Sequence, residues 1–340
     1  MPSEILAHVI RGETVESIHR GHIFVVDGEA NTVASIGDPS TVTFFRSAAK
    51  PFQALPFITS GAADAFGFTE DEIAMAIASH SGEKMHVERV ASMLGKIGLT
   101  ESDLRCGVHA PFYKKEANRM LREGEKLTQL HNNCSGKHTA MLALAKHLGA
   151  DIETYDSSDN RVQKRILRCI SDFTGVPEIE IALGSDGCCV PNFAVSVAAM
   201  AKSFANLVFS LNFHPIVQAA SKRIVDAMMN YPNLIGGTDR LDTMLMQATA
   251  GRIISKVGAD GVWLCGVMPS DKYPSGLGIA LKVEDGDDYR GRPVVAVELL
   301  RQLAVLGPNE VLDLSPSTIK NRRGDVVGKV IASFELDEMK

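Results

Sequence analysis

The chain has 340 residues, of which 45% are hydrophobic and 22% charged, a composition typical of globular proteins and unlike disordered or fibrous chains. Its formal net charge of −6 provides no positive field for phosphates, so we expect no nucleic-acid partner. Its six cysteines are too few for a disulfide scaffold. No secretion signal is evident at the N-terminus, and the longest apolar stretch, residues 193–211, is interrupted by Lys202 and Asn206. We therefore expect a cytoplasmic protein without a membrane span.

Two apolar segments near the N-terminus, residues 22–27 and 32–36, flank the turn-forming residues 28–31. Runs rich in β-branched and aromatic residues that are separated by such a turn predict a β-hairpin.

The middle of the chain, from residue 47 to residue 249, has apolar residues at helical spacing. A helix is expected to start near Ser47, and further helices are predicted at residues 71–78, 85–98, 115–130, 137–148, 161–173, 193–209 and 215–229.

The last ninety residues return to a β pattern around one predicted helix at residues 293–306. Strands are predicted at residues 252–257, 261–267, 278–283 and 326–334. Strands at both ends with helices between them predict an α+β fold, in which both ends of the chain share one antiparallel sheet. We expect a single unit over residues 1–340, with a sheet lobe at about 1–46 plus 250–340 and a mainly helical lobe at about 47–249.

The first chemical signal is a Ser-x-x-Lys motif, formed by Ser47 and Lys50 just before Pro51. Proline is tolerated in the first turn of a helix, so both side chains are expected on one face at a helix start. A lysine whose pKa is lowered by burial can deprotonate a serine, and Ser-x-x-Lys is one known arrangement for serine acyl transfer. A simple helix cap beside a surface lysine is the alternative interpretation.

A second serine and a later lysine follow the order found in penicillin-recognising enzymes. Ser79 lies in a small polar cluster, Ser79–Glu83, directly after an apolar helical run, and Gly82 alone would suit a helix C-terminus. Lys256 lies on a predicted strand near Gly258, where Val257 replaces the threonine of a Lys-Thr-Gly strand. These two matches are degenerate and support the first motif only weakly.

Two cysteine-bearing loops predict a metal site. Cys134, Lys137 and His138 have the offsets that bring side chains to one face of a helix, and Cys188 lies in a second polar loop. Thiolates suit zinc, and histidine is a common further ligand. Buried cysteines are more often inert, and we interpret Cys106, Cys169 and Cys265 in that way.

Together these blocks resemble the asparaginases of the Rhizobium etli type, also called class 3. The resemblance runs through residues 46–53, 79–83, 133–139, 186–188 and 256–261 and covers essentially the whole chain. It implies a fold like that of serine β-lactamases and serine glutaminases, hydrolysis of L-asparagine to aspartate and ammonia, and a homodimer.

The resemblance also implies roles for individual residues. Ser47 would pair with Lys50, and Ser79 with Lys256, as two serine–lysine tandems. Zinc would be held by three ligands, and three further residues would face the substrate. The implied zinc ligands are Cys134, Lys137 and Cys188, and the implied substrate-binding residues are Arg46, His138 and Asp186.

In the expected mechanism Lys50 deprotonates Ser47, which attacks the side-chain carboxamide and releases ammonia. Lys50 or the Ser79–Lys256 pair then activates water to hydrolyse the aspartyl ester, with backbone N–H groups near Ser47 as oxyanion donors. Zinc is placed at the α-amino and α-carboxylate end of the substrate. The alternatives are a glutaminase, a penicillin-recognising acyl-transferase, and a zinc-binding protein without catalytic activity.

Overall fold

The computed structural model describes residues 2–336, and its contacts divide the chain into two compact units. The first unit contains residues Met1–Ala48, Val195–Phe209 and Met244–Lys340, and the second contains Ala49–Ala194 and Ser210–Thr243. Within residues 2–336, no helix has both the length and the apolar character required to cross a membrane.

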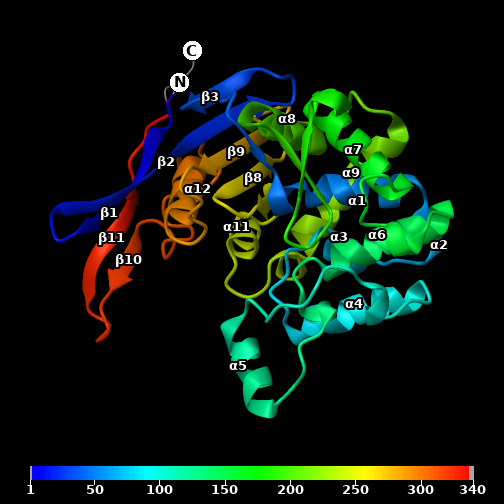
Figure 1. Ribbon diagram of the computed structural model, residues 1–340. Coiled ribbons are helices and arrows are strands. Elements are labelled where there is room, and N and C mark those ends of the chain that lie inside the picture. The colour runs from blue at the N-terminus through cyan, green and yellow to red at the C-terminus, as the bar shows by residue number, and fades with distance from the viewer. Residues whose placement is uncertain (1, 337–340) are drawn as a thin grey trace. The chain divides into compact units, whose positions relative to one another are not determined.

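The first unit is built on an eight-stranded sheet with the order β10-β11-β1-β2-β9-β8-β7, in which β3 also pairs with β2. Its first and last strands lie side by side, with Val9 opposite Val330 (Figure 1). The antiparallel α+β sheet shared by both ends of the chain is thereby confirmed. The sheet strands are β1 (Glu4–Arg11), β2 (Thr14–Asp27), β3 (Thr32–Ile36), β7 (Ile253–Val257), β8 (Val262–Val267), β9 (Leu277–Val283), β10 (Ser317–Lys320) and β11 (Val326–Ala332).

Two helices of the first unit pack on this sheet, α8 (Val197–Val208) against β9, β2 and β8, and α12 (Gly291–Gln302) mainly against β11. Gly278 of β9 permits a close approach of α8, because a Cβ there would lie 2.0 Å from the carbonyl oxygen of Ala201. The contacts therefore group α8 with the sheet, whereas the sequence prediction had assigned these residues to the helical lobe at about 47–249.

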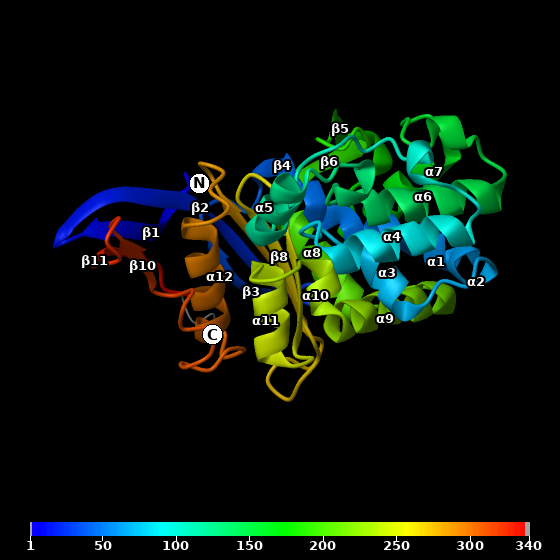
Figure 2. The same ribbon diagram turned by 90° about the horizontal axis from the view of Figure 1, so that it is seen from below.

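The second unit is mainly helical, and α1 (Lys50–Thr59) lies among α3, α6, α7 and α9 (Figure 2). Every residue of α1 from Lys50 to Ile58 is buried. The other helices of this unit are α2 (Ala62–Ala65), α3 (Glu70–Ile77), α4 (Lys84–Lys96), α5 (Lys114–Glu123), α6 (Ser135–Leu148), α7 (Arg161–Thr174), α9 (Pro215–Asn230) and α10 (Pro232–Ile235). The strand β5 (Ala182–Ser185) pairs with β6 (Pro191–Ser196), and the chain also forms β4 (Val42–Phe44) and α11 (Leu241–Thr249).

Two predicted helices are wrong in extent. The helix expected at residues 115–130 ends at Glu123, because Gly124 takes a left-handed conformation and caps it. The helix expected at residues 193–209 begins only at Val197, since the preceding residues form β6. There the Ser196 hydroxyl accepts a hydrogen bond from the Ala199 N–H and marks the helix start.

Candidate active site

The site residues predicted from the sequence are divided between the two units. The helical unit contains Lys50, Ser79 and the cysteine-bearing loops, whereas the sheet unit contains Arg46, Ser47 and Lys256.

Lys50 is the first residue of α1 and is fully buried. Its Nζ donates to the carbonyl oxygens of Ala78 at 2.6 Å and Asn133 at 3.2 Å, and it lies 2.9 Å from the Ser79 Oγ. Burial lowers the pKa of Lys50 and the positive charge of Lys137 adds to this effect, while the Cys134 and Cys188 thiols oppose it without reversing the direction. The side chain thus has the environment of an amine that can lose its proton.

Ser79 is held in place by the backbone around it. Helix α3 ends at Ile77, and the extended segment that follows is fixed by a hydrogen bond from the Ser79 N–H to the Ile235 carbonyl, 2.8 Å long. Ser81 donates to the carbonyl oxygen of Gly236 at 2.8 Å. Gly82 takes the left-handed conformation, although it lies beyond the end of the helix and does not cap it. The polar Ser-His-Ser segment is therefore an ordered loop that presents Ser79 to Lys50.

His80 supports the same loop from the other side. Its Nδ1 accepts from the Gly82 N–H at 3.2 Å, so its Nε2, 2.9 Å from the Ser135 Oγ, is the protonated nitrogen. The Ser135 hydroxyl in turn donates to the Leu130 carbonyl. Burial lowers the pKa of His80 well below its ordinary value, which keeps the ring neutral. The sequence analysis singled out this loop without identifying its link to Ser135.

The predicted metal ligands Cys134, Lys137 and Cys188 lie together in the helical unit. Lys137 Nζ donates to Cys188 Sγ at 3.0 Å, and the two thiols interact through a hydrogen bond. That hydrogen bond and the charge of Lys137 lower the pKa of Cys188 to about 5. The hydrogen bond and burial raise the pKa of Cys134 to about 12. Burial lowers the pKa of Lys137, but electrostatic interactions with the two cysteines and with Asp186 outweigh this effect and raise the pKa above its ordinary value.

This cluster offers two sulfur donors and one amine. Among residues 2–336, no three His, Cys, Asp or Glu side chains come together in an arrangement that could hold a metal ion. The set Cys134, Lys137 and Cys188 differs from such an arrangement because its third donor is the amine of a lysine. Its donor types fit zinc, provided that Lys137 loses its proton to the solvent when the metal binds.

His138 and Asp186 flank the cluster. Asp186 is half-buried, and its Oδ2 lies 3.7 Å from Cys188 Sγ. His138 is fully buried, and its Nδ1 lies 2.7 Å from the hydroxyl of Tyr155, a residue that the sequence analysis did not single out.

In the sheet unit, Arg46 and Ser47 lie in a short 3-10 turn, Arg46–Ala49. Arg46 has a φ of 52° and forms an ion pair with Asp260, a partner that no sequence motif indicated. Ser47 is half-buried. This turn leads directly into α1, so that Ser47 precedes Lys50 by three residues along the chain.

Lys256 lies on β7 and is fully buried, with its Nζ donating to the Val257 carbonyl at 3.2 Å. The turn between β7 and β8 is held by Arg292, which donates to the carbonyl oxygens of Gly258 and Val262. Lys256 therefore lies on a hairpin of the sheet unit whose turn is hydrogen-bonded to Arg292.

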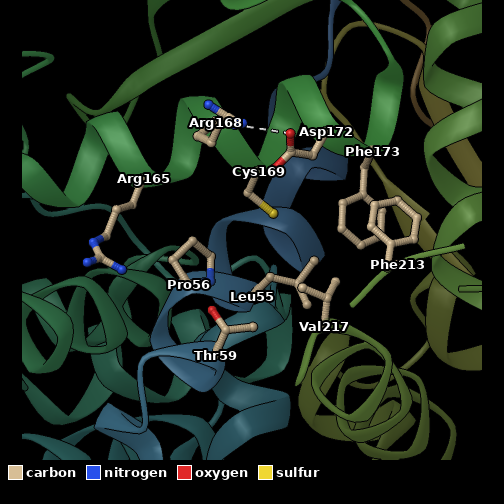
Figure 3. Close-up of a pocket in the computed structure, with 10 residues that line it drawn as sticks. All are labelled: Leu55, Pro56, Thr59, Arg165, Arg168, Cys169, Asp172, Phe173, Phe213 and Val217. Atoms are coloured by element: carbon tan, nitrogen blue, oxygen red, sulfur yellow. Dashed lines mark hydrogen bonds and ion pairs between the residues drawn. The ribbon is translucent and has the colours of Figure 1, made fainter. Parts of the chain in front are cut away.

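A separate pocket of about 200 Å³ lies on the other part of α1, against α7 and the start of α9 (Figure 3). Its apolar walls include Leu55, Phe173 and Phe213, and Arg168 at its edge pairs with Asp172. None of the residues predicted from the sequence as site residues lines it. The pocket is therefore not part of the candidate active site.

Comparison with known protein families identifies the chain. The family described as L-asparaginase II matches residues 7–332, nearly the whole sequence. The chain belongs to the L-asparaginase II family. Membership in this family makes the protein an amidohydrolase that acts on small molecules, consistent with a buried amine held beside a serine hydroxyl. No curated protein matches the chain in a sequence search.

The chain is also distantly similar to solved structures. A probable glutaminase from Bacillus subtilis complexed with 6-diazo-5-oxo-L-norleucine is 15% identical with a TM-score of 0.39, covering 84% of this chain and 83% of that one. A Bacillus glutaminase in the presence of 4.3 M NaCl is 14% identical with a TM-score of 0.37, covering 84% of this chain and 89% of that one. At these values the likeness bears on neither mechanism nor substrate, which depend on the residues of this chain.

Proposed function

We propose that the protein hydrolyses L-asparagine to L-aspartate and ammonia through an acyl-enzyme on Ser47. The observation that carries the proposal is the buried Lys50 amine, 2.9 Å from the Ser79 hydroxyl and between two backbone carbonyls. A neutral amine has two N–H bonds and one lone pair. The carbonyls of Ala78 and Asn133 can accept the two N–H bonds, and the Ser79 and Cys134 side chains also contact the amine. We propose that the lone pair accepts the Ser47 proton during the reaction.

In the acylation half, Lys50 accepts the proton of the Ser47 hydroxyl as Ser47 Oγ bonds to the side-chain carbonyl carbon of asparagine. The carbon–nitrogen bond then breaks, and the leaving nitrogen takes the proton from Lys50 and departs as ammonia. In the deacylation half, a water molecule loses a proton to Lys50 and attacks the ester. Ser47 regains a proton as aspartate leaves.

Ser79 and Lys256 are proposed as assisting groups. The Ser79 hydroxyl lies next to the Lys50 Nζ throughout this cycle, where it stabilises whichever protonation state the lysine holds. Lys256 is fully buried in β7 and is proposed as a second base. Arg46 and Asp186 are proposed to contact the polar groups of the substrate.

Zinc is proposed at Cys134, Lys137 and Cys188. Lys137 already lies 3.0 Å from Cys188 Sγ, and the two thiols contact one another, so the three donors are close together within the helical unit. A bound zinc ion would supply positive charge for the α-amino and α-carboxylate end of asparagine. The serine and lysine chemistry above does not depend on it.

The deciding assay measures ammonia release from L-asparagine and from L-glutamine by the purified protein, before and after treatment with a chelator. We expect a higher kcat/KM for asparagine. Pockets distinguish one methylene by only about 10- to 200-fold, so weak glutamine turnover is compatible with the proposal. Preference for glutamine would establish the glutaminase alternative, and hydrolysis of a β-lactam instead of either amide would establish the acyl-transferase.

The matched variants are Ser47→Ala and Ser60→Ala, since Ser60 is a half-buried serine at the other end of α1. Ser47→Ala should abolish turnover, whereas Ser60→Ala should leave it unchanged. Bound zinc without ammonia release from any amide would instead support the non-catalytic zinc protein. The homodimer implied by the resemblance and the cytoplasmic location expected from the sequence stay predictions. Light scattering of the purified protein tests the oligomeric state.

A further inference from the structure

A buried chain of hydrogen bonds leads to His138. The Arg105 backbone N–H donates to the Tyr155 hydroxyl at 2.9 Å, and that hydroxyl lies 2.7 Å from His138 Nδ1. Tyr155 and His138 both have no exposed surface, and their rings meet edge to face with centroids 5.5 Å apart. The other ring nitrogen of His138, Nε2, is buried without a hydrogen-bond partner among the described residues.

Counting donors and acceptors decides the tautomer of His138. If Nδ1 carried the proton, the Tyr155 hydrogen would lack an acceptor among its described neighbours, and the Nε2 lone pair would be unsatisfied as well. If Nε2 carries the proton, Tyr155 donates to Nδ1 and only the Nε2–H remains unsatisfied. Buried polar groups without partners are costly, so the second arrangement is the stable one.

The remaining N–H needs an acceptor, and its surroundings indicate which one. His138 follows Lys137 on α6 and is four residues after Cys134, the offset that brings two helical side chains to one face. A buried donor without a partner in the protein calls for an acceptor from outside the chain, such as a ligand, an ion or a water molecule. In asparagine the groups that can only accept hydrogen bonds are the α-carboxylate and the amide oxygen.

We propose that Tyr155 is a positioning residue that fixes His138 in its Nε2–H form, and that this N–H donates to the α-carboxylate of asparagine. The choice of ligand depends on the function proposed above, whereas the tautomer does not. Because the contact is made equally to the substrate and to the transition state, its loss should raise KM and leave kcat unchanged.

The first test is Tyr155→Phe, with Tyr273→Phe as the matched control, since the Tyr273 hydroxyl donates to the Leu303 carbonyl at 2.9 Å in the sheet unit. Tyr155→Phe should raise KM for asparagine about tenfold, the effect of one lost hydrogen bond to a charged group. Its kcat should stay within about twofold, and Tyr273→Phe should change neither constant. An unchanged KM in a folded Tyr155→Phe protein would overturn the proposal.

The second test reads the tautomer directly by nitrogen-15 NMR of the histidine rings. We expect His138 to show a protonated Nε2 and an unprotonated Nδ1, and Tyr155→Phe to convert this single form to a mixture. A protonated Nδ1 in the unmodified protein would refute the positioning role, whether or not any amide is hydrolysed. Failure of the proposed function and failure of this inference are thereby distinguished.

The third test asks whether Tyr155 acts through His138. Glutamine has no counterpart of Nδ1, so His138→Gln removes the ring atom that Tyr155 is proposed to hold. In that background Tyr155→Phe should cause no further rise in KM. A full additional tenfold rise would show that Tyr155 acts independently of His138, which contradicts the proposal. Should Tyr155→Phe fail to fold, the tautomer of the unmodified protein still decides the proposal, because a protonated Nδ1 refutes it.

Discussion

The Nζ of Lys50 lies 2.9 Å from the Oγ of Ser79, and both side chains are buried. They are 29 residues apart in the chain and come from different elements, the start of α1 and the loop after α3. The sequence prediction paired Lys50 with Ser47 and Ser79 with Lys256. The contact places the Lys50 amine beside Ser79 as well, and the proposed mechanism makes that amine the proton acceptor.

Replacement of this lysine should remove most of the activity. We expect Lys50→Met to lower kcat for asparagine by about a hundredfold to ten-thousandfold, the usual contribution of a general base. The control is Lys146→Met, since Lys146 lies on α6 and bonds a backbone carbonyl with an exposed side chain. A Lys50→Met protein that folds and retains its kcat would exclude Lys50 as the base.

Ser79→Ala should have a smaller effect than Ser47→Ala. Loss of the Ser79 hydroxyl removes one neighbour of Lys50 but no bond to the substrate, so we expect kcat to fall about tenfold. Ser81→Ala is the matched control, because Ser81 is also buried in this loop and donates to the Gly236 carbonyl. Equal and complete loss of activity in Ser79→Ala and Ser47→Ala would mean that both serines are indispensable.

Activity should increase with pH through the pKa of Lys50. Burial lowers that pKa below the ordinary value of a lysine, and the base functions only when it is neutral. A plot of kcat/KM against pH should therefore show an acid limb in which activity is lost as pH falls, while Ser79→Ala should shift its midpoint. A rate independent of pH across the stable range would contradict a lysine base.

Stability should fall in mild acid because of His80. Its folded-state pKa is lowered well below the ordinary value by burial, so below about pH 6.5 the unfolded chain binds a proton that the folded protein does not. The stabilisation is complete above pH 6.5 and is lost as pH decreases. The free energy of unfolding should decline by up to about 1.4 kcal/mol per pH unit for this residue. Urea titrations at several pH values give the free energy of unfolding as a function of pH, and the slopes for the unmodified protein and for His80→Gln should differ by this amount. Equal slopes in the two proteins would refute the role of His80.

Zinc content can be tested with adjacent cysteines. Cys188 is buried against Lys137, whereas the adjacent Cys189 is exposed. Elemental analysis should find zinc in the unmodified protein and in Cys189→Ser, and should find little in Cys188→Ser. Equal zinc in both variants would show that the metal binds elsewhere.

Much of the fold could be predicted because hydrophobic periodicity is local information. The hairpin of β2 and β3 and the strands β7, β8 and β9 followed from alternation and turns. The extent of α8 could not be predicted, because a continuous apolar run does not distinguish a buried strand such as β6 from a helix. β10 was not predicted, because it has only four residues, two of them exposed, and pairs with β11. β1 lies within the first forty-five residues, which were expected to form strands, but its own bounds were not predicted.

The candidate site was predictable where residues are close in sequence and much less so elsewhere. Spacing alone predicted that Cys134 and Lys137 lie close together at the start of α6. The preference of zinc for thiolates suggested Cys188 as their partner. The contact between Lys50 and Ser79 and the contact between His138 and Tyr155 depend on how helices and loops pack. No spacing rule contains that information.

The most direct test of the account is to identify the acylated residue. The unmodified protein is mixed rapidly with L-asparagine and quenched in acid, and its peptides are analysed by mass spectrometry. We predict an aspartyl ester on Ser47 that is absent from Ser47→Ala. If deacylation is slower than acylation, replacement of Lys50 should increase the amount of this ester. An aspartyl ester on Ser79, or undiminished turnover of asparagine by Ser47→Ala, would contradict the central claim.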